Sequence, residues 1–304
     1  MRSSTESDIT GSPKGGADLP SLSVVIACRN SASTLAHTLE SIAQQRYNGW
    51  WEVLVIDDGS TDATVSIAQH FAGRLPNLQV LAARNPGGQA RALNFGIEKS
   101  AGDVFVFIDS DDLISEGYLE LFGRALLRAP FVGGQLDVVK LNPANVRDRR
   151  NRLQEKQIDV FCGFRPAVIG ASMGAQRLPL EKVSGFDESL GTQHDLDLSW
   201  RLAAAGYPAT FVPGAVLHYR YRTGFLAFFR QERGYGIGEV MLYRKFRDAG
   251  MPSRSWLQVF AAYARVLIAL TRLANPGGAA RLATTLGATI GRLEGSLRYR
   301  TPYL

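Results

Sequence analysis

Short apolar runs alternate with amphipathic stretches through the first half of the chain. Four apolar runs with many β-branched side chains are expected to form strands: residues 22–27, 52–57, 78–83 and 103–109. Four stretches with apolar side chains at helical spacing are expected to form helices: residues 31–45, 61–71, 88–100 and 115–128. Strands that alternate with helices predict an α/β fold, with a mostly parallel, twisted sheet flanked by helices.

The middle of the chain is less regular. Residues 141–157 are polar and charged, which is typical of a flexible loop. The apolar segment 167–175 is expected to return to the sheet, and residues 194–206 are expected to form a helix. Two short strands are expected to follow: residues 210–212 and 215–217.

The last third predicts three helices: residues 223–249, 256–273 and 279–297. The second of these is strongly apolar but contains Arg265 and Arg272. A membrane-spanning helix needs about 20 apolar residues with few charges, so this segment is marginal in length and Arg265 would be costly at its centre. The sequence leaves three alternatives open: the helix lies on a membrane surface, it packs on the body or in an oligomer contact, or it spans the bilayer.

These patterns divide the chain into three parts. Residues 1–20 are polar and rich in Ser and Gly, so they are expected to form a disordered lead-in, and they have no apolar core of signal-peptide length. Residues 21–220 are expected to form the α/β domain. Residues 221–304 are expected to form a basic, amphipathic helical C-terminal region.

Charge is distributed unevenly between these parts. The 304 residues carry a net charge of +6, but the segment from His218 to the C-terminus carries 14 Lys and Arg against 4 Asp and Glu, a net charge of +10. The first 217 residues therefore carry −4. A basic end permits an anionic partner, such as an anionic membrane surface, an anionic acceptor or nucleic acid. No nucleic-acid motif accompanies the basic, aromatic segment 218–236, so nucleic acid is not expected, and a lid or acceptor wall is the simpler interpretation.

The two cysteines, Cys28 and Cys162, make neither a disulfide framework nor a metal cluster of their own. Such sparse cysteine usage favours a reducing compartment, so we expect a cytoplasmic protein, with the inner face of the cell membrane as a further option.

Two groups of carboxylates follow expected strands. Asp57 and Asp58 end the second strand, and Asp109, Asp111 and Asp112 end the fourth. In a parallel sheet these groups share one edge, which is where ligands bind in such folds. Small groups of oxygen ligands suit Mg²⁺ or Mn²⁺, whereas a lone Asp in a turn more often caps a helix.

The ordered set of motifs in this chain resembles the family 2 glycosyltransferases of the GT-A fold. The resemblance runs from residue 22 to about residue 218, and these motifs carry it: SVVIACRN at 23–30, VIDDGSTD at 55–62, NPGG at 85–88, ARALNFG at 90–96, FIDSDD at 107–112, SGFDE at 184–188 and HDLDLSWRLAAAG at 194–206. It implies a nucleotide-diphosphate sugar as donor, with UDP favoured, a divalent metal (Mn²⁺ or Mg²⁺), and an inverting single displacement.

The resemblance also implies roles for particular residues. Asp58 matches the aspartate that binds the nucleotide base, Asp109 lies near the ribose, and Asp111 holds the metal. His218 matches a further metal ligand of some GT-A enzymes. The remaining donor-site predictions are Ala27, Arg29, Arg91 and Ser110, with Arg84 as an alternative to Arg91.

Asp195 matches the aspartate that is the proposed general base of the family. The family pattern has an acid before this aspartate, but the chain has His194, which puts that position's acceptor-binding role in doubt. Three residues are predicted to contact the acceptor: His194, Gly170 and Trp200. Asp197 and Arg201 are spaced for an ion pair within a helix, and Asp62 is expected to cap one.

The predicted residue types suit the chemistry of sugar transfer from a nucleotide-diphosphate sugar. A departing nucleotide diphosphate builds negative charge, which a divalent cation stabilises, and an acceptor hydroxyl needs a base to take its proton. The acceptor is a glycan, a lipid or a small molecule. Three rivals remain: transfer to a lipid phosphate, which needs no base; a sugar-nucleotide nucleotidyltransferase, which releases pyrophosphate; and a membrane-surface scaffold without activity. A homodimer through the C-terminal helices is also possible.

Overall fold

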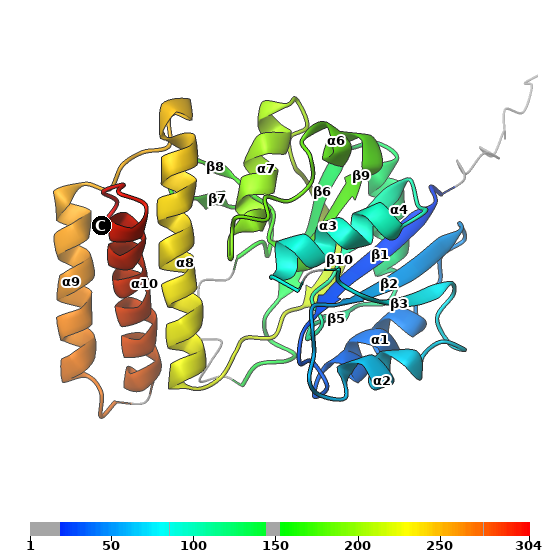
Figure 1. Ribbon diagram of the computed structural model, residues 1–304, viewed down its shortest axis with the longest axis horizontal. Helices are drawn as coiled ribbons and strands as arrows, with labels where there is room; N and C mark the ends of the chain where they lie inside the picture. Colours follow the sequence, from blue (N-terminus) through cyan, green and yellow to red (C-terminus); the bar gives the residue numbers. More distant parts are fainter. Residues whose placement is uncertain (1–18, 85, 144–152, 276) are drawn as a thin grey trace, which may run out of the picture.

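One curled sheet of eight strands organises the protein, in the order β3-β2-β1-β4-β9-β6-β10-β5 (Figure 1). The computed structural model describes residues 19–84, 86–143, 153–275 and 277–304. Most of the expected lead-in and much of the expected loop at 141–157 lie outside these residues, as does Asn85. The main strands are β1 (Leu22–Cys28), β2 (Trp51–Asp57), β3 (Leu78–Ala82), β4 (Val104–Phe107), β5 (Leu113–Ile114), β6 (Phe131–Asp137), β9 (Met173–Gln176) and β10 (Thr210–His218).

The sheet is mostly parallel, as expected. β1 pairs in parallel with β2 and β4, β2 with β3, and β6 with β10. β9 is antiparallel to both of its neighbours, β4 and β6, and β5 is antiparallel to β10. The expected return of segment 167–175 to the sheet is confirmed by β9, which follows a short 3-10 turn, η1 (Gly170–Ser172).

Helices cover both faces of the sheet because the strands are apolar on both sides. The first core holds α1 (Leu35–Ala43), α2 (Thr64–Gln69) and α4 (Tyr118–Leu126), and the second holds α3 (Gln89–Lys99), α6 (Arg177–Lys182) and α7 (His194–Ala204). Along β1, Val24 and Ile26 enter the first core and Val25 the second, which is the period-2 alternation of a strand buried on both faces.

Two expectations for the strands are corrected. The segments 210–212 and 215–217 belong to one strand, β10, whose register shifts between Val212 and Val216. Strand β6 was not expected, because Gly133 and Gly134 interrupt its apolar pattern. A Cβ on Gly133 would lie 2.8 Å from Val168, so the missing side chains allow close packing against a neighbouring segment.

The C-terminal region is helical, as expected. It consists of α8 (Phe225–Phe246), a 3-10 turn η2 (Arg247–Ala249), α9 (Trp256–Thr271) and α10 (Gly278–Arg298), and the three α-helices lie side by side at one end of the molecule (Figure 1). A third core joins Trp200 of α7 to Val240 and Phe246 of α8, and a small hairpin, β7 (Val160–Phe161) and β8 (Arg165–Pro166), lies near it. Among the described helices, none has the length and apolarity that crossing a membrane requires.

Candidate active site

The loops that follow β1, β2 and β4 are hydrogen-bonded into one rim. Asn30 Oδ1 accepts the backbone N–H of Thr61 at 2.8 Å, and the backbone N–H of Asn30 donates to Ser60 Oγ at 2.9 Å. The hydroxyl oxygens of Ser31 and Ser110 lie 2.8 Å apart. The expectation that both groups of carboxylates share one edge of the sheet is therefore confirmed.

The DSDD segment forms a compact acidic group. Asp109, Asp111 and Asp112 each bring a carboxylate oxygen to within 4.8 Å of the others. Burial, with the charge of Asp111 adding to it, raises the pKa of Asp109 to about 7, although Gln89 Nε2 donates to Asp109 Oδ1 at 2.6 Å and opposes the rise. Burial also raises the pKa of Asp111 and of Asp112. These surroundings disfavour three bare negative charges, and a divalent cation would compensate them.

Asp112 ties the acidic group to the segment after β10. It is fully buried, and its Oδ1 accepts the backbone N–H of Arg220 at 2.6 Å. Arg220 Nε donates to the carbonyl oxygen of Asp111 at 2.9 Å. The Oδ2 atom of Asp112 has no hydrogen-bond partner among the described residues. An orphaned, buried carboxylate oxygen beside two further carboxylates fits a cation at this point.

Asp58 is buried where β2 ends, and it holds the loop before α3. Its carboxylate accepts the backbone N–H groups of Gly87 at 2.8 Å and Gly88 at 3.0 Å. Arg29 is largely exposed, and its Nη1 lies 3.7 Å from Asp58 Oδ2. Ala27 is half-buried near the end of β1. These predicted donor-site residues therefore lie along one stretch of the rim.

The side chain of Arg91, on α3, points away from the acidic group. Its Nε donates to Glu188 Oε2 at 3.1 Å, and the alternative Arg84 pairs with Glu98 at 3.2 Å. Both arginines line a hollow of about 380 Å³ beside α3. No contact in the described structure joins either of them to the acidic group.

Asp195 lies in the first turn of α7 and faces the acidic group. Its Oδ2 accepts the backbone N–H of Gly170, and its Oδ1 accepts that of Leu196, each at 2.9 Å. The negative charge of Asp195 contributes to the raised pKa of Asp109, so the two carboxylates are close enough to interact electrostatically. The structure thus brings the predicted base, Gly170 and the acidic group together.

The other two predicted acceptor contacts are buried. The ring of His194 packs edge-on against Phe186, with centroids 5.5 Å apart, and its Nδ1 has no hydrogen-bond partner among the described residues. Burial lowers the pKa of His194, while two nearby carboxylates oppose the shift. Trp200 is fully buried, and its indole N–H donates to the carbonyl of Arg165 at 3.2 Å. Both side chains form part of the support behind Asp195.

Two structural expectations nearby are confirmed. Asp197 and Arg201 form a 2.7 Å ion pair inside α7. Asp62 Oδ1 accepts the backbone N–H of Thr64, the first residue of α2, at 3.0 Å, which serves as a cap.

His218 ends β10 beside the acidic loop, where it pairs with Leu113 of β5. It is not part of the acidic group defined by the 4.8 Å separation. Its Nδ1 lies 2.7 Å from Asp137 Oδ2. Burial acts to raise the pKa of Asp137, but hydrogen bonds from Val139 and His218 outweigh it and hold that pKa below its usual value. The ionised carboxylate must accept, so Nδ1 donates. When the ring is neutral, Nε2 keeps a lone pair.

Three residues at the acidic group were not expected from the sequence: Gln89, Arg220 and Arg222. Arg222 and Arg220 both act to lower the pKa of Asp111, against the effect of burial. The sequence did contain an indication of them, because Gln89 lies in the GQARALNFG segment (88–96) and both arginines follow His218 in HYRYR (218–222). Only the fold shows that these two segments meet at the end of β4.

The sequence pattern of the Glycosyl transferase family 2 matches residues 23–183, and that of the Glycosyl transferase family group 2 matches residues 104–290. The chain belongs to glycosyl transferase family 2. The match spans the rim, the acidic group and most of the sheet.

A curated relative is Glycosyltransferase AglE of Haloferax volcanii, which is 29% identical over 196 residues, covering 64% of this chain and 64% of that protein. The chain spans about half to two thirds of the length of the first curated relatives that it matches.

Two solved structures share the GT-A fold. The mannosyltransferase PcManGT of Pyrobaculum calidifontis, in complex with GDP-Man and Mn²⁺, has a TM-score of 0.64 at 19% identity, covering 91% of this chain and 87% of that one. TarS 1-349 of S. aureus, in complex with UDP-GlcNAc, has a TM-score of 0.55 at 16% identity, covering 93% of each chain. At these identities the likeness shows the fold alone.

Proposed function

We propose that this protein transfers a sugar from a nucleotide-diphosphate sugar to an acceptor hydroxyl, with inversion and by direct displacement. The observation that carries the proposal is the placement of Asp195 and the Asp109–Asp112 group on one site, where the charge of Asp195 acts on Asp109. Membership of glycosyl transferase family 2 supports it. The structural neighbours bind UDP-GlcNAc and GDP-Man, and we favour a UDP-sugar as the donor here.

The rim supplies the donor site. In this proposal Asp58 and Arg29 bind the nucleotide base, and Asp109 binds the ribose. Ser110 and Ser31 hold the two loops together through their hydroxyl groups. Arg222 and Arg220 place positive charge beside the carboxylates, where a diphosphate would need it.

The residues present fit a divalent cation, Mn²⁺ or Mg²⁺. Asp111 would be the principal ligand, and Asp109 and the orphaned Oδ2 of Asp112 lie within reach of the same point. His218 would supply Nε2, because its Nδ1 is engaged with Asp137. When bound, such a cation supplies Lewis-acid stabilisation of the charge on the departing diphosphate.

Asp195 acts as the general base in this proposal. The backbone N–H groups of Gly170 and Leu196 fix its carboxylate at the start of α7. Each carboxylate oxygen keeps a further lone pair. With it, Asp195 accepts the proton of the acceptor hydroxyl while the hydroxyl oxygen attacks the anomeric carbon and the nucleoside diphosphate leaves. The buried ring of His194 and the fully buried Trp200 hold α7 in place behind it.

A thermal-shift panel tests the donor site. The protein is melted with UDP, GDP, UDP-GlcNAc and GDP-Man, each with and without Mn²⁺. A ligand that binds the native state raises the melting temperature, so at least one nucleotide should do so in the presence of Mn²⁺. If none of them shifts the melting temperature, the donor-site proposal is wrong.

Product analysis and an Asp195 variant together separate the proposal from its two enzymatic rivals. A nucleoside diphosphate and an inverted linkage are expected, whereas a nucleotidyltransferase would consume a nucleoside triphosphate and release pyrophosphate. Transfer to a lipid phosphate would also release a nucleoside diphosphate. It differs in needing no base, so turnover would survive the loss of the Asp195 carboxylate.

The finer placement of the protein is also a proposal. We infer a cytoplasmic location, at the inner face of the cell membrane, and the support for a reducing compartment is that Cys28 and Cys162 are both free thiols. A homodimer formed through the C-terminal helices is the alternative to membrane contact. Light scattering after size exclusion would measure the oligomeric state.

A further inference from the structure

Helix α9 exposes large apolar side chains along its whole length. Trp256, Phe260 and Leu267 are 68%, 69% and 65% exposed. Together with Tyr263 and Leu270 they recur at spacings of four, three, four and three residues, so they form one stripe on the helix. The buried residues of α9 are Ala262 and Ala269, which lie on the opposite side, toward α10.

The apolar surface is wider than a narrow helix seam. Leu257 and Ile268 flank the stripe and are 61% and 48% exposed. An exposed apolar patch of this breadth is unusual for a protein surface and marks an interaction site. A two-stranded coiled coil would cover only the narrow a/d stripe and would leave the flanking side chains in water.

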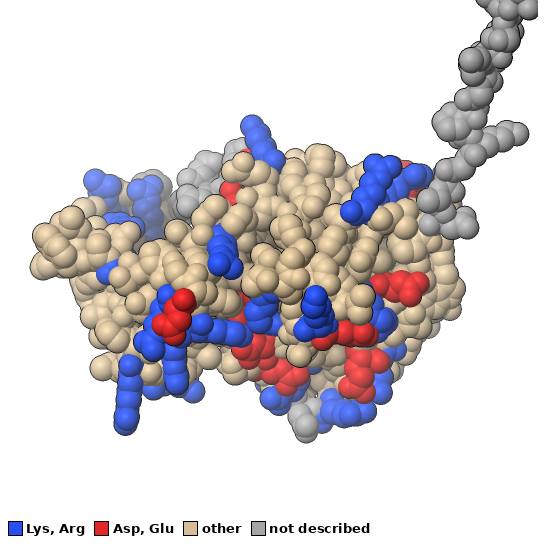
Figure 2. Space-filling view, turned by 90° about the horizontal axis from the view of Figure 1, so that it is seen from above, with Lys and Arg blue, Asp and Glu red and all other residues tan. Residues whose placement is uncertain are grey.

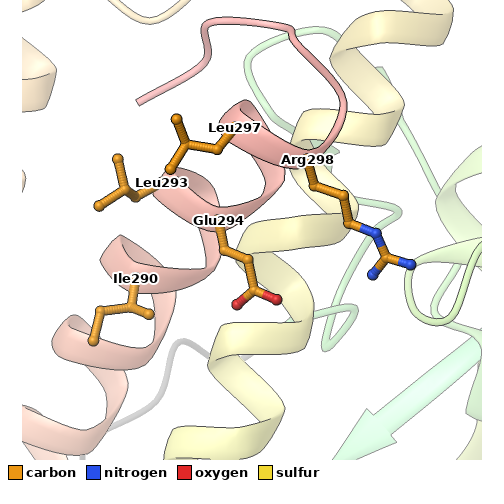
Figure 3. A pocket seen from close by; sticks show the side chains of 5 residues that line it. All are labelled: Ile290, Leu293, Glu294, Leu297 and Arg298. Atoms are coloured by element: carbon orange, nitrogen blue, oxygen red, sulfur yellow. The ribbon is translucent and has the colours of Figure 1, made fainter.

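A second apolar strip lies on the neighbouring helix. Ile290, Leu293 and Leu297 follow one side of α10, where they line a shallow hollow with Glu294 and Arg298 (Figure 3). Leu297 is 73% exposed. Glu294 turns toward α8, where Arg233 pairs with it at 2.6 Å.

The charged residues of the segment that carries α9 and α10 are almost all positive. Residues 251–304 contain seven arginines, no lysine, and Glu294 as their single acid, a net charge of +6. Figure 2 shows uncharged side chains edged by basic ones at the end of the molecule that carries the C-terminal helices, and acidic side chains gathered mainly over the sheet domain. Arg265 is exposed on the side of α9 away from the stripe, and its Nε donates to the carbonyl of Ala261 at 3.0 Å.

We propose that the α9 face docks on the surface of an anionic lipid bilayer. The helix lies in the plane of the interface, with Trp256, Phe260 and Leu267 among the acyl chains, while the net charge of +6 on residues 251–304 attracts the anionic phosphates. Charge complementarity selects this partner, because the basic surroundings attract an anionic bilayer. A second copy would bring another segment of net charge +6 against the first, which is repulsive.

This docking goes beyond the proposed reaction, because it needs neither donor nor metal. Helix α8 connects the docking face to the candidate site. Thr192 Oγ1, in the loop before α7, donates to the carbonyl of Gly234 at 2.9 Å, and a Cβ on Gly238 would lie 2.7 Å from Gln193 Oε1. The helices that carry the apolar face are thus packed through α8 against the loop that leads into Asp195.

Vesicle co-sedimentation with the full chain tests the proposal. Vesicles of phosphatidylcholine alone are compared with vesicles that also contain phosphatidylglycerol, at low and high salt. The protein should bind the anionic vesicles and be released by salt. The matched variants are Leu267→Asp on α9 and Leu178→Asp on α6, because both leucines are similarly exposed, at 65% and 69%.

Leu267→Asp should lower the vesicle partition coefficient about tenfold or more, because an interfacial leucine is lost and a negative charge is added. Leu178→Asp should leave it unchanged. Thermal melts check that both variants fold. Absent vesicle binding, or equal loss in both variants, overturns the proposal. So does a lipid-independent dimer that Leu267→Asp dissociates, since that outcome assigns the face to a second copy. The nucleotide thermal-shift panel on the same preparation reports the donor site separately.

Discussion

The backbone N–H of Gly170 donates to Asp195 Oδ2 at 2.9 Å, which joins the turn before β9 to the start of α7. A Cβ at Gly170 would lie 3.2 Å from the Asp195 Cβ, so the turn and the helix approach each other closely. Backbone N–H groups donate to both oxygens of the carboxylate and fix its orientation.

Asp195→Asn should therefore remove the basicity of this group and keep the fold. Its side-chain oxygen can still accept one of the two backbone hydrogen bonds. We expect kcat for a hydroxyl acceptor to fall about 10²–10⁴-fold while donor binding is retained. Steady-state kinetics and nucleotide thermal shifts measure the two effects. Near-normal turnover in this variant would instead favour a phosphate acceptor.

Asp111→Asn should abolish the effect of Mn²⁺ on nucleotide binding. The substitution removes a charge from the acidic group that the cation is expected to neutralise. The expected result is a nucleotide-dependent melting shift that no longer responds to Mn²⁺. Asp248→Asn is the matched control, because the Asp248 side chain is 93% exposed and lies in η2, far along the chain from the acidic group. An unchanged Mn²⁺ response in Asp111→Asn contradicts the assignment.

His218→Ala should alter the choice of metal. Neutral imidazole suits Mn²⁺ better than Mg²⁺, so a histidine ligand would favour Mn²⁺. The variant should weaken the Mn²⁺ dependence of nucleotide binding about tenfold and change the Mg²⁺ dependence less. Titrations with each metal at fixed nucleotide concentration measure the difference. Equal changes for both metals would show that His218 acts only by holding Asp137.

The interface between the sheet domain and α8 should weaken in acid. Burial acts to raise the pKa of Asp187, but hydrogen bonds from Lys245 and Ser189 outweigh it and lower that pKa to about 2. A carboxyl whose pKa is lower in the folded state stabilises the fold above its unfolded pKa of 3.8, and the contribution is lost as the pH falls toward 2. Solvent screens this partly exposed pair, so the contribution is about 1 kcal/mol.

Lys245→Met removes the partner that lowers the pKa of Asp187. Denaturant unfolding at several pH values below about 5 should show a smaller acid-dependent loss of unfolding free energy in the variant than in the parent. Lys245 also pairs with Asp197 at 2.6 Å, so the variant should be less stable at neutral pH as well. Parallel pH profiles for the two proteins would contradict the pKa argument.

Gly291→Ala should destabilise the C-terminal helices. Its Cβ would lie 2.1 Å from the carbonyl oxygen of Arg233, so α8 and α10 would have to move apart. We expect a loss of about 1–3 kcal/mol in unfolding free energy. Gly191→Ala is the control, because a Cβ there meets no atom within 4 Å. Equal effects in thermal melts would exclude close backbone packing as the cause.

Local patterns predict the first half of this fold well. β1, β2 and β4 are short runs of apolar side chains, and the carboxylates that end them are visible in the sequence. β6 is not recognised in the sequence because its glycines allow contacts with residues distant in the chain, Val168 at Gly133 and Ser172 at Gly134. The antiparallel direction of β9 depends on its partners, β4 and β6, and not on its own residues. Gln89 and Arg220 belong to the site only because the fold brings separate loops to the end of β4.

The position of β9 sets the order in which the sheet is completed. One edge of β4 pairs with β1, and the other pairs with Met173–Gln176, which lie about 70 residues later in the chain. During synthesis, that edge of β4 has no native partner until those residues have emerged. Arg220, whose backbone binds Asp112, emerges later still. The acidic loop thus reaches its final shape only after Arg220 has been made, 108 residues after Asp112.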